Sequence, residues 1–384
     1  PLFQEQCMAL AVKAAGFTPG EADQLRRAMA AWKRKGDQIY RFGQKLIDGM
    51  MKNGIPRSFA ERCFEQIKGF SEYGFPESHA ASFALLVYAS SWLKCHHPAE
   101  FTAALLNSQP MGFYAPAQLI RDAREHNVTV RPIDVNHSAW DCTIEPDGAL
   151  RLGMRLVGGS RKEDADAIRA AVERHGPYSS LLTLWRESGS SALTFRRLAG
   201  ADAFNSMNLS RQEALWNARL LRDEKLPLFD QTEEPEAEPG LPALSPQQHT
   251  TLDYNATGLS LKSHPLEFLR QGLKARKVRP CSDLRSERTC PNDRPIAVAG
   301  LVLVRQRPGT ASGVTFITIE DETGIANLII WRQVYEQYRK QARATMIIAH
   351  GKVQREGEVV HVIVSRIQAL DATEQLTVRS RNFH

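Results

Sequence analysis

One stretch of the sequence ends in Cys95, His96 and His97, three residues whose side chains can bind a metal ion. A metal site requires several such side chains to converge on one point. Neighbouring residues on a helix point about 100° apart at 3.6 residues per turn, so the two histidines diverge. The six cysteines also lack the paired spacing of zinc ligands. We therefore expect no metal site in this chain.

The same stretch begins with Ser78 and His79, directly before an apolar run that we expect to form a buried helix. Ser78 stands where an N-cap residue would satisfy the free amides of that helix. The first amides of a helix and its dipole favour anions, so both residues are candidates for binding phosphate. The alternative is that both residues only cap the helix.

A basic segment lies nearer the start of the chain, on a predicted helix and its exit. It contains Arg26, Arg27 and Lys33, followed by two more cations. Such side chains can neutralise the charge of a triphosphate, although an isolated run of charge is more often a solvated helix face. Arg26 and Arg27 are the first candidates for a nucleotide contact, and Lys33 is a further one.

Residues 150–178 resemble a helix-hairpin-helix, in which the first amides of the second helix bind a DNA phosphate without reading the base sequence. Gly159 is at the turn of this hairpin. The position of the usual second glycine is occupied by Arg161, so we expect Arg161 and Lys162 to act as phosphate contacts. Residues 195–215 are either a second copy of the hairpin or ordinary helical core.

The last part of the chain changes to period-two alternation, which predicts strands. Ile317 and Ile319 should face the core and Phe316 should point outward. Trp331 ends its strand and is either buried or available to stack on a base. Mixed cations and aromatics of this kind bind single strands in OB-folds, and the candidates are Arg305, Arg307, Phe316, Trp331, Lys352 and Arg355.

The elements that must position these residues follow from the same patterns. Helical periodicity covers 3–50, 58–70, 78–95, 98–107 and 116–127, and the strand order after residue 295 is that of an OB-fold. We predict a multidomain α+β protein with a helical first region, a helix-hairpin-helix region and a C-terminal OB-fold β-barrel. The predicted boundaries are 1–145, 146–222, 223–294 for an acidic linker and tether, 295–372, and 373–384 for a tail.

The totals agree with a chain that binds a polyanion. The 384 residues carry a net charge of +6, while residues 223–240 hold seven acids and one base, so the surplus lies elsewhere. No run of about 18 apolar residues predicts a membrane span, and we expect reduced thiols and a cytoplasmic location. The first residue is Pro1, which indicates that a longer polypeptide precedes it.

The segment "YGFPESHAASFALLVYASSWLKCHHPAEFTAALLNS" closely resembles the fingers region of C-family bacterial DNA polymerases, the family of the replicative polymerase III alpha subunit. The segments "FQEQCMALAV" and "ADQLRRAMAAWK" are similar to other parts of those fingers. Within the family, "GLVLVRQRPGTASGVTFITIEDETGIANLIIW" and "GKVQREGEVVHVIV" look most like the error-prone, damage-inducible branch often called ImuC. The resemblance covers nearly the whole chain.

The resemblance implies damage-induced translesion synthesis on primer-template DNA from deoxynucleoside triphosphates, with ImuA-type and ImuB-type mutasome proteins as partners. In the family, basic finger residues face the incoming nucleotide, which supports nucleotide contacts at Arg26, Arg27, Lys33, Ser78 and His79. The clustered carboxylates of the family's palm are not found, and Asp134 is expected to be a turn or cap residue. Mg²⁺ should therefore bind in a palm domain outside this chain, which alone should be inactive.

Two expectations remain open in the sequence. Replicative relatives carry a sliding-clamp-binding peptide near the place of "KLPLF", whose Leu228 and Phe229 would fill an apolar pocket of a clamp. The first residue of that peptide is Lys225 instead of the usual glutamine, so packing on its own protein is the alternative. A stand-alone module that binds single-stranded DNA without catalysis would explain the hairpin and OB regions equally well.

Overall fold

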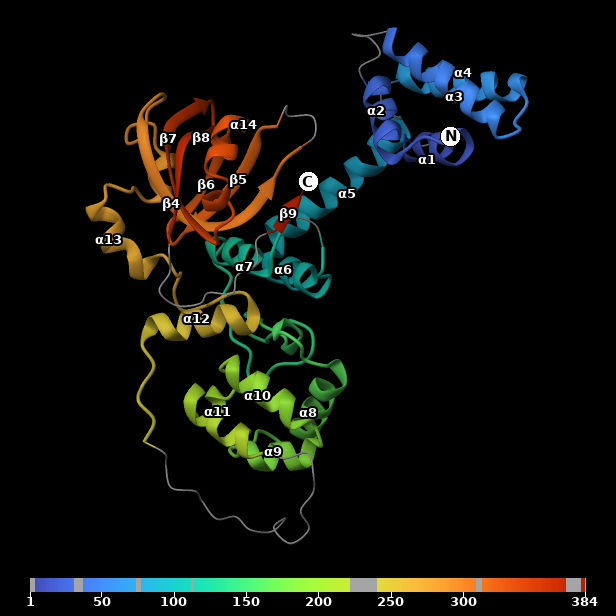
Figure 1. Cartoon of the computed structure of the whole chain (residues 1–384). Coiled ribbons are helices and arrows are strands. Elements are labelled where there is room, and N and C mark those ends of the chain that lie inside the picture. Colours follow the sequence, from blue (N-terminus) through green and yellow to red (C-terminus); the bar gives the residue numbers. More distant parts are fainter. Residues whose placement is uncertain are drawn as a thin grey trace. The chain divides into compact units, whose positions relative to one another are not determined.

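The computed structural model describes residues 4–30, 37–73, 77–111, 114–221, 240–308, 313–370 and 381–383. The chain divides into two compact units, Pro1–His96 and His97–His384 (Figure 1). No helix within these described ranges is both long and apolar enough to cross a membrane. The mixed α+β architecture agrees with the predicted fold class.

The described part of the first unit consists of helices, as its periodicity predicts. They are α1 Gln4–Ala15, α2 Pro19–Ala30, α3 Asp37–Lys52, α4 Arg57–Tyr73 and α5 Glu77–His96. Apolar residues at helical spacing on the first four helices form one core that includes Cys7, Leu25, Leu46, Met50 and Ile67. Thr18 and Glu21 cap α2 reciprocally, since the amide of each donates to the side chain of the other. This cap fixes the start of the helix that carries Arg26.

Two glycines let α3 lie close to its neighbours. A Cβ at Gly49 would collide with the carbonyl oxygen of Ala15, and a Cβ at Gly43 would collide with the ring of Phe64. These positions therefore have a packing reason for glycine, although glycine weakens an isolated helix by about 1 kcal/mol relative to alanine.

The prediction that α5 is a buried helix is corrected by the structure. Leu85 is 74% exposed, Tyr88 is 73% exposed and Val87 is 61% exposed. The prediction rests on the rule that a helix that is apolar on all sides is buried. Within the described part of this unit, the middle of α5 lies outside the core that α1–α4 form.

The second unit begins with helices and a small sheet that share one core. Its elements are α6 Pro98–Asn107, α7 Pro116–Glu125, β1 Val130–Arg131, β2 Thr143–Ile144, β3 Leu150–Arg151, η1 Met154–Leu156, α8 Lys162–His175, α9 Leu181–Ser188, α10 Ala192–Gly200, η2 Asn205–Met207, α11 Arg211–Leu220 and α12 Pro246–Thr257. Residues 97–145, which the sequence reading grouped with the preceding helices, contribute Leu106, Ile120 and Val135 to the core that also contains Ile168 and Phe195.

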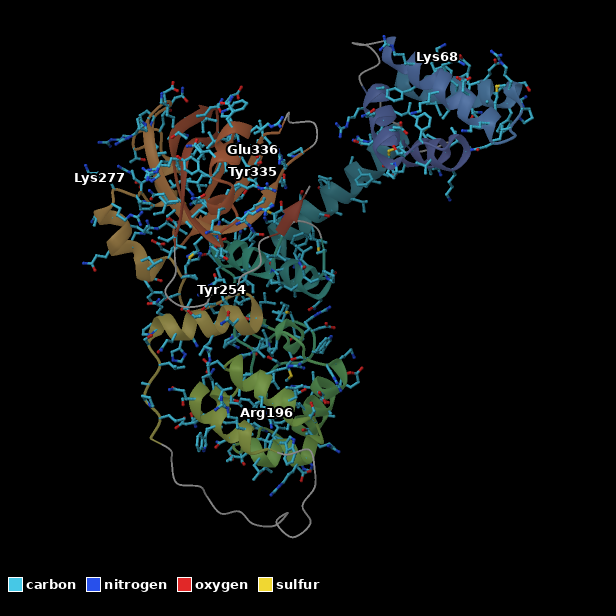
Figure 2. The ribbon with its side chains drawn as sticks, viewed as in Figure 1. Lys68, Arg196, Tyr254, Lys277, Tyr335 and Glu336 are labelled. Carbon is cyan, nitrogen blue, oxygen red and sulfur yellow. The ribbon has the colours of Figure 1, made fainter. Side chains whose placement is uncertain are left out.

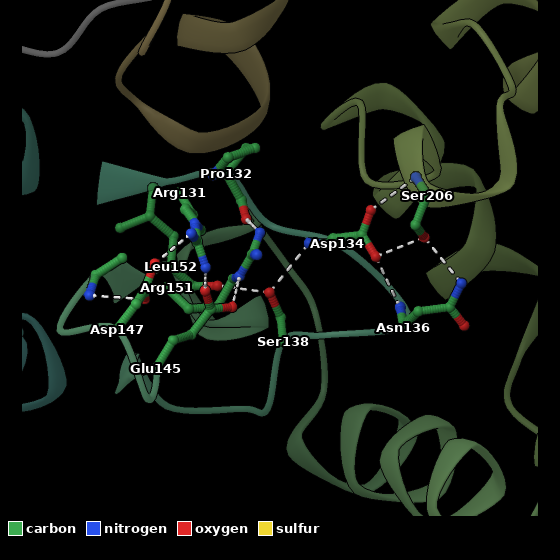
Figure 3. Close-up of polar contacts among 11 residues, drawn as sticks. Arg131, Pro132, Asp134, Asn136, Ser138, Glu145, Asp147, Arg151, Leu152 and Ser206 are labelled. Atoms are coloured by element: carbon green, nitrogen blue, oxygen red, sulfur yellow. Dashed lines mark hydrogen bonds and ion pairs between the residues drawn. The ribbon is translucent and has the colours of Figure 1, made fainter. Parts of the chain in front are cut away.

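Asp134 joins the loop between β1 and β2 to η2 (Figure 3). Its carboxylate accepts hydrogen bonds from the Asn136 amide at 2.9 Å, the Ser206 amide at 3.0 Å and the Ser206 hydroxyl at 2.7 Å. A carboxylate that accepts from an amide two residues on forms an Asx turn. Asp134 is thus a turn and cap residue, in agreement with the sequence prediction.

Arg211 is the largest fully buried side chain of the second unit and holds α11 against α12. Its guanidinium donates to the His249 carbonyl at 3.0 Å and to the carboxylate of Asp253, and lies 3.6 Å from Asp202. Lys262 also reaches Asp202, at 2.6 Å. These charges are paired and hydrogen-bonded, which is the condition under which burial of an ion is tolerated.

The segment that leads into the barrel contains η3 Glu267–Leu269, α13 Arg270–Ala275 and η4 Cys281–Arg285. The barrel elements are β4 Pro295–Gln306, β5 Thr315–Asp321, β6 Gly324–Ile330, α14 Arg332–Gln337, α15 Arg339–Ala342, β7 Met346–Glu356 and β8 Val359–Ala369. Neighbours pair in the order β5, β6, β8, β7, β4, and the pairing of β4 with β5 closes the barrel. A short strand, β9 Arg381–Phe383, pairs parallel with the end of β4.

Period-two alternation correctly identified the inside of the barrel. Ile317 and Ile319 are 1% and 0% exposed and belong to the barrel core, whereas Phe316, which precedes Ile317, is half-buried. The predicted order of three strands, a helical segment and two strands is confirmed.

Candidate nucleic-acid interface

In the first unit, Arg26 and Arg27 lie side by side on α2 and share one carboxylate, Asp23. The Arg26 guanidinium donates to Asp23 Oδ1 at 3.0 and 2.8 Å, and Arg27 Nη2 lies 2.5 Å from Oδ2. The hydrogen bonds from Arg26, and then those from Arg27, hold the pKa of Asp23 below its usual value. The arginine side chains are 39% and 42% exposed. Exposed pairs within one helix are weak, so a stronger anion can replace Asp23.

The remaining predicted nucleotide contacts are only partly described. Ser78 and His79 are in the first turn of α5, and their side chains lie outside the described residues. Because α5 begins at Glu77, Ser78 lies within the helix, which corrects its predicted N-cap position. Lys33 also lies outside the described residues. Of the five candidates, the structure therefore brings together Arg26 and Arg27.

In the second unit, Gly159 forms the turn between η1 and α8. Its φ of +76° lies in the left-handed region, and a Cβ there would lie 2.9 Å from the Arg197 guanidinium carbon. Arg197 donates to the Gly159 carbonyl. The turn is therefore held from α10, and its left-handed conformation favours glycine.

The start of α8 differs from the start of α10. The N-cap of α8 is Arg161, whose side chain makes no cap hydrogen bond to the first-turn amides. At α10, Asp164 accepts from the Ser191 hydroxyl at 3.0 Å and from Thr194 Oγ1 at 2.5 Å. Burial raises the pKa of Asp164, but the hydrogen bonds from Thr194 and Ser191 outweigh it and lower the pKa overall. The carboxylate at the start of α10 is thus Asp164 of α8, and the first turn of α8 carries Glu163 and Asp164 itself. The N-cap of α8 supplies no carboxylate or hydroxyl.

A second helical hairpin, formed by α9 and α10, was not predicted from the sequence. Helix α9 ends at Gly189 in the left-handed conformation and α10 begins two residues later at its N-cap Ser191. The sequence contains a signal for this hairpin, because a glycine often follows the end of a helix and a serine often precedes the start of the next one. In the region proposed instead, Leu198 and Phe204 are buried in the core, as the ordinary-core alternative expected.

Removing the two cations at the start of α8, Arg161 and Lys162, should weaken the binding of duplex DNA equally for all base sequences. Arg161 is exposed, and Lys162 pairs with Asp166 of its own helix at 2.7 Å. For Arg161→Ala with Lys162→Ala, we expect the slope of log affinity against log salt to become shallower by about 1.8. Fluorescence anisotropy with a short duplex measures this slope. The control is Arg169→Ala with Arg174→Ala on the same helix, and an equal change in both double variants would contradict the assignment.

In the barrel, two predicted DNA contacts have a structural role. Arg305 donates through Nε to the Ala342 carbonyl at 2.8 Å and through Nη2 to the Ala344 carbonyl. Arg355 donates to the carbonyls of Leu284 and Cys290 at 2.8 and 3.2 Å. Their guanidinium groups hold loops in place, so the structure gives no support for phosphate contacts by these two residues.

The other barrel candidates are accessible. Trp331 is 55% exposed, which favours the stacking alternative over core burial. It lines a hollow of about 610 Å³ together with Lys352, which is also exposed. Arg307 lies over the Tyr335 ring at 5.5 Å and 3.7 Å from Glu336. An exposed indole beside a cation suits a stacked base and its phosphate.

Replacing Trp331 by alanine should reduce the affinity for single-stranded DNA by about 5- to 100-fold, because base–aromatic stacking contributes about 1–3 kcal/mol per base. Anisotropy titration with a labelled oligothymidine measures this loss. Trp216→Ala provides the control, since Trp216 is 39% exposed on α11. Unchanged affinity for the Trp331 variant would remove the indole from the interface.

Two further predictions concern a metal site and a clamp-binding segment. Among the described residues, no group of three or more His, Cys, Asp or Glu side chains is arranged to hold a metal ion. Leu228 and Phe229 lie outside the described residues.

Comparison with protein families matches three parts of the chain. Residues 1–54 match the bacterial DNA polymerase III alpha subunit finger domain. Residues 127–214 match the helix-hairpin-helix motif, and residues 296–370 match the OB-fold nucleic acid binding domain. These three ranges contain α2, the hairpin before α8, and the closed barrel.

Curated relatives match nearly the whole chain. The chain is 50% identical over 390 residues to error-prone DNA polymerase 2 of Rhizobium meliloti, a match that covers 97% of this chain and 35% of the relative. It is 51% identical to the error-prone DNA polymerase of Brucella abortus, with 96% and 35% covered. For the error-prone DNA polymerase of Alkalilimnicola ehrlichii the identity is 50%, with 100% and 38% covered. The chain thus spans about a third of the length of the curated relatives it matches.

Among solved structures, the chain is similar to asparaginyl-tRNA synthetase from Pyrococcus horikoshii. The identity is 22%, the TM-score is 0.22, and the match covers 25% of this chain and 24% of that one.

Proposed function

Because the chain belongs to the error-prone branch of the bacterial C-family DNA polymerases, we propose that it supplies the surfaces that bind nucleotide and DNA in an error-prone, DNA-directed DNA polymerase. The observation that carries the proposal is the continuous match over 97% of the chain, which includes the first unit as well as the hairpin and barrel. The substrates are deoxynucleoside triphosphates and primer-template DNA.

Each part of the chain has a separate task in this proposal. On α2, Arg26 and Arg27 exchange their shared partner Asp23 for the triphosphate, and Lys33, Ser78 and His79 complete the contact. Gly159, Arg161 and Lys162 hold a duplex phosphate at the start of α8. Trp331 and Lys352, with Arg307 and Phe316 nearby in the barrel, bind single-stranded template.

The chemical step takes place outside this chain in the proposal. Nucleotidyl transfer by two Mg²⁺ ions requires clustered carboxylates, and the described residues hold no such group. A palm domain within the remaining length of the polymerase would bind the ions, while the residues of this chain bind and orient the substrates. Synthesis across damaged template, with ImuA-type and ImuB-type proteins as partners and a clamp contact through Leu228 and Phe229, belongs to the same proposal.

A stand-alone module for single-stranded DNA is the second candidate, favoured by the exposed Trp331 in a closed OB barrel. The two candidates differ in the first unit. Primer extension by the full-length polymerase with Arg26 and Arg27 replaced tests the first candidate. The module would be favoured if the Arg26 and Arg27 variant still extends primers while variants of the hairpin and the barrel lose DNA binding.

A further inference from the structure

A second hollow on the barrel lies under α13 and contains none of the residues that the sequence nominated. The segment after α13 is fixed to β4, because the Arg279 amide donates to the Ala297 carbonyl at 2.8 Å. Between this segment and strands β4, β7 and β8 lies a hollow of about 1010 Å³. Figure 2 shows Lys277 on the side of the barrel that carries α13.

The lining of this hollow is strongly basic. Its described residues include five cations and one carboxylate, namely Arg270, Lys274, Lys277, Arg279, Arg294 and Asp283. Arg279 pairs with Asp283 at 2.6 Å, and Arg270 pairs with Asp321 at 2.7 Å. The charges of these two arginines are therefore compensated within the protein.

The other three cations are available to a ligand. Lys274, Lys277 and Arg294 are exposed, and none of the three pairs with a carboxylate among the described residues. Arg294 donates one hydrogen bond from Nη1 to the Thr289 carbonyl at 2.6 Å, which fixes its position at the rim. Three exposed cations at one hollow form an anion-binding surface.

Two residues of β7, His350 and Gly351, also line the hollow. Gly351 stands where β7 bulges, and a Cβ at this position would collide with the Ile363 carbonyl oxygen of β8. His350 lines the hollow beside it, and its buried Nε2 has no hydrogen-bond partner within the described part of the chain.

The basic hollow continues into the hollow that holds Trp331. Pro295, Gly351 and Ser365 line both of them. The combined track therefore has three unpaired cations at one end and an exposed indole with Lys352 at the other. Cations that follow a phosphate chain together with an aromatic that stacks a base are the features that OB-folds use for single strands.

We propose that single-stranded nucleic acid runs through both hollows, with its phosphates at Lys274, Lys277 and Arg294 and a base on Trp331. This path rests on the proposed function and extends it to a face of the barrel outside the predicted contacts. An acidic protein segment would use the cations alone, whereas the indole at the far end favours a base.

The test compares two triple variants of the whole chain, with anisotropy titration of a labelled oligothymidine over a range of salt. Replacing Lys274, Lys277 and Arg294 by glutamine should lower affinity about tenfold and make the salt slope shallower by about 2, since each single-strand phosphate contact contributes about 0.7. The matched control replaces Arg339, Lys340 and Arg343, which are exposed at α15, by glutamine. The control should retain the slope, and circular dichroism verifies that both variants fold.

The outcomes separate this path from the proposed function. Equal weakening by both triple variants would mean that only net charge matters and would overturn the path. Displacement of the oligonucleotide by poly-glutamate at equal charge concentration would assign the hollow to an acidic protein segment and also overturn it. If Trp331→Ala weakens binding while the α13 triple variant does not, the path fails and the proposed function stands. A wild-type chain that binds no oligothymidine would count against the single-strand role itself.

Discussion

Replacing Arg26 and Arg27 together by alanine is expected to lower kcat/KM for the incoming deoxynucleotide about 100-fold in a polymerase that contains this whole chain. Both guanidinium groups share Asp23 on an exposed face of α2. Such surface pairs contribute about 0–1 kcal/mol, whereas a hydrogen bond to a charged group contributes about 1.5–3 kcal/mol. The triphosphate therefore gains more from the arginines than Asp23 loses. Steady-state single-nucleotide insertion measures the effect.

The control for this double variant is Arg57→Ala. Arg57 is exposed on α4 and pairs with Glu61 of the same helix at 2.8 Å, so it has a similar local setting. Its replacement should leave insertion within about twofold, since an exposed pair contributes so little. Insertion kinetics that are the same for both variants would exclude α2 from the nucleotide site.

Replacing Arg211 by alanine is expected to cost about 3–5 kcal/mol of unfolding free energy, the largest loss of stability foreseen for any charged residue described here. The variant leaves the buried carboxylate of Asp253 without its guanidinium partner, and Asp202 with Lys262 alone. Urea denaturation monitored by tryptophan fluorescence measures the loss. Because the chain has two units, the loss should be confined to the transition of the second unit.

Two further variants test whether the loss of stability at Arg211 comes from the burial of its charge or from the removal of any arginine. Arg169→Ala removes an exposed arginine paired with Glu173 at 2.8 Å, and should change stability by less than about 1 kcal/mol. Replacing Arg211 by methionine and Asp253 by leucine together should recover part of the loss, because no isolated charge remains between them. An Arg211→Ala chain as stable as the parent would show that the cluster does not hold α11 and α12 together.

The barrel was predictable because its information is local. Alternation placed Ile317 and Ile319 inside and Phe316 outward, and the strand order identified the OB-fold. The turn role of Asp134 was also local, since one of its acceptor bonds involves an amide two residues away. Residue type, spacing and turn chemistry act over a few positions, so the sequence alone reveals them.

The roles of individual charges were less predictable because they depend on distant neighbours. Arg305 was nominated for DNA, but its partners at Ala342 and Ala344 lie about forty positions away in the chain. The burial of Arg211 depends on Asp253, which the sequence gives no reason to place beside it. The apolar pattern of α5 predicted burial, whereas Leu85 and Tyr88 are exposed in the structure. The basic hollow under α13 combines residues from four separate segments and has no sequence signature.

The most direct test of the central claim is hydrogen–deuterium exchange of the full-length polymerase on primer-template DNA, with and without the correct incoming nucleotide. We predict that the nucleotide slows exchange in α2 and in the first turn of α5, while DNA alone protects the start of α8 and the barrel. Protection of the hairpin and barrel by DNA, with no response of α2 or α5 to nucleotide, would contradict the claim and identify the chain as a DNA-binding module.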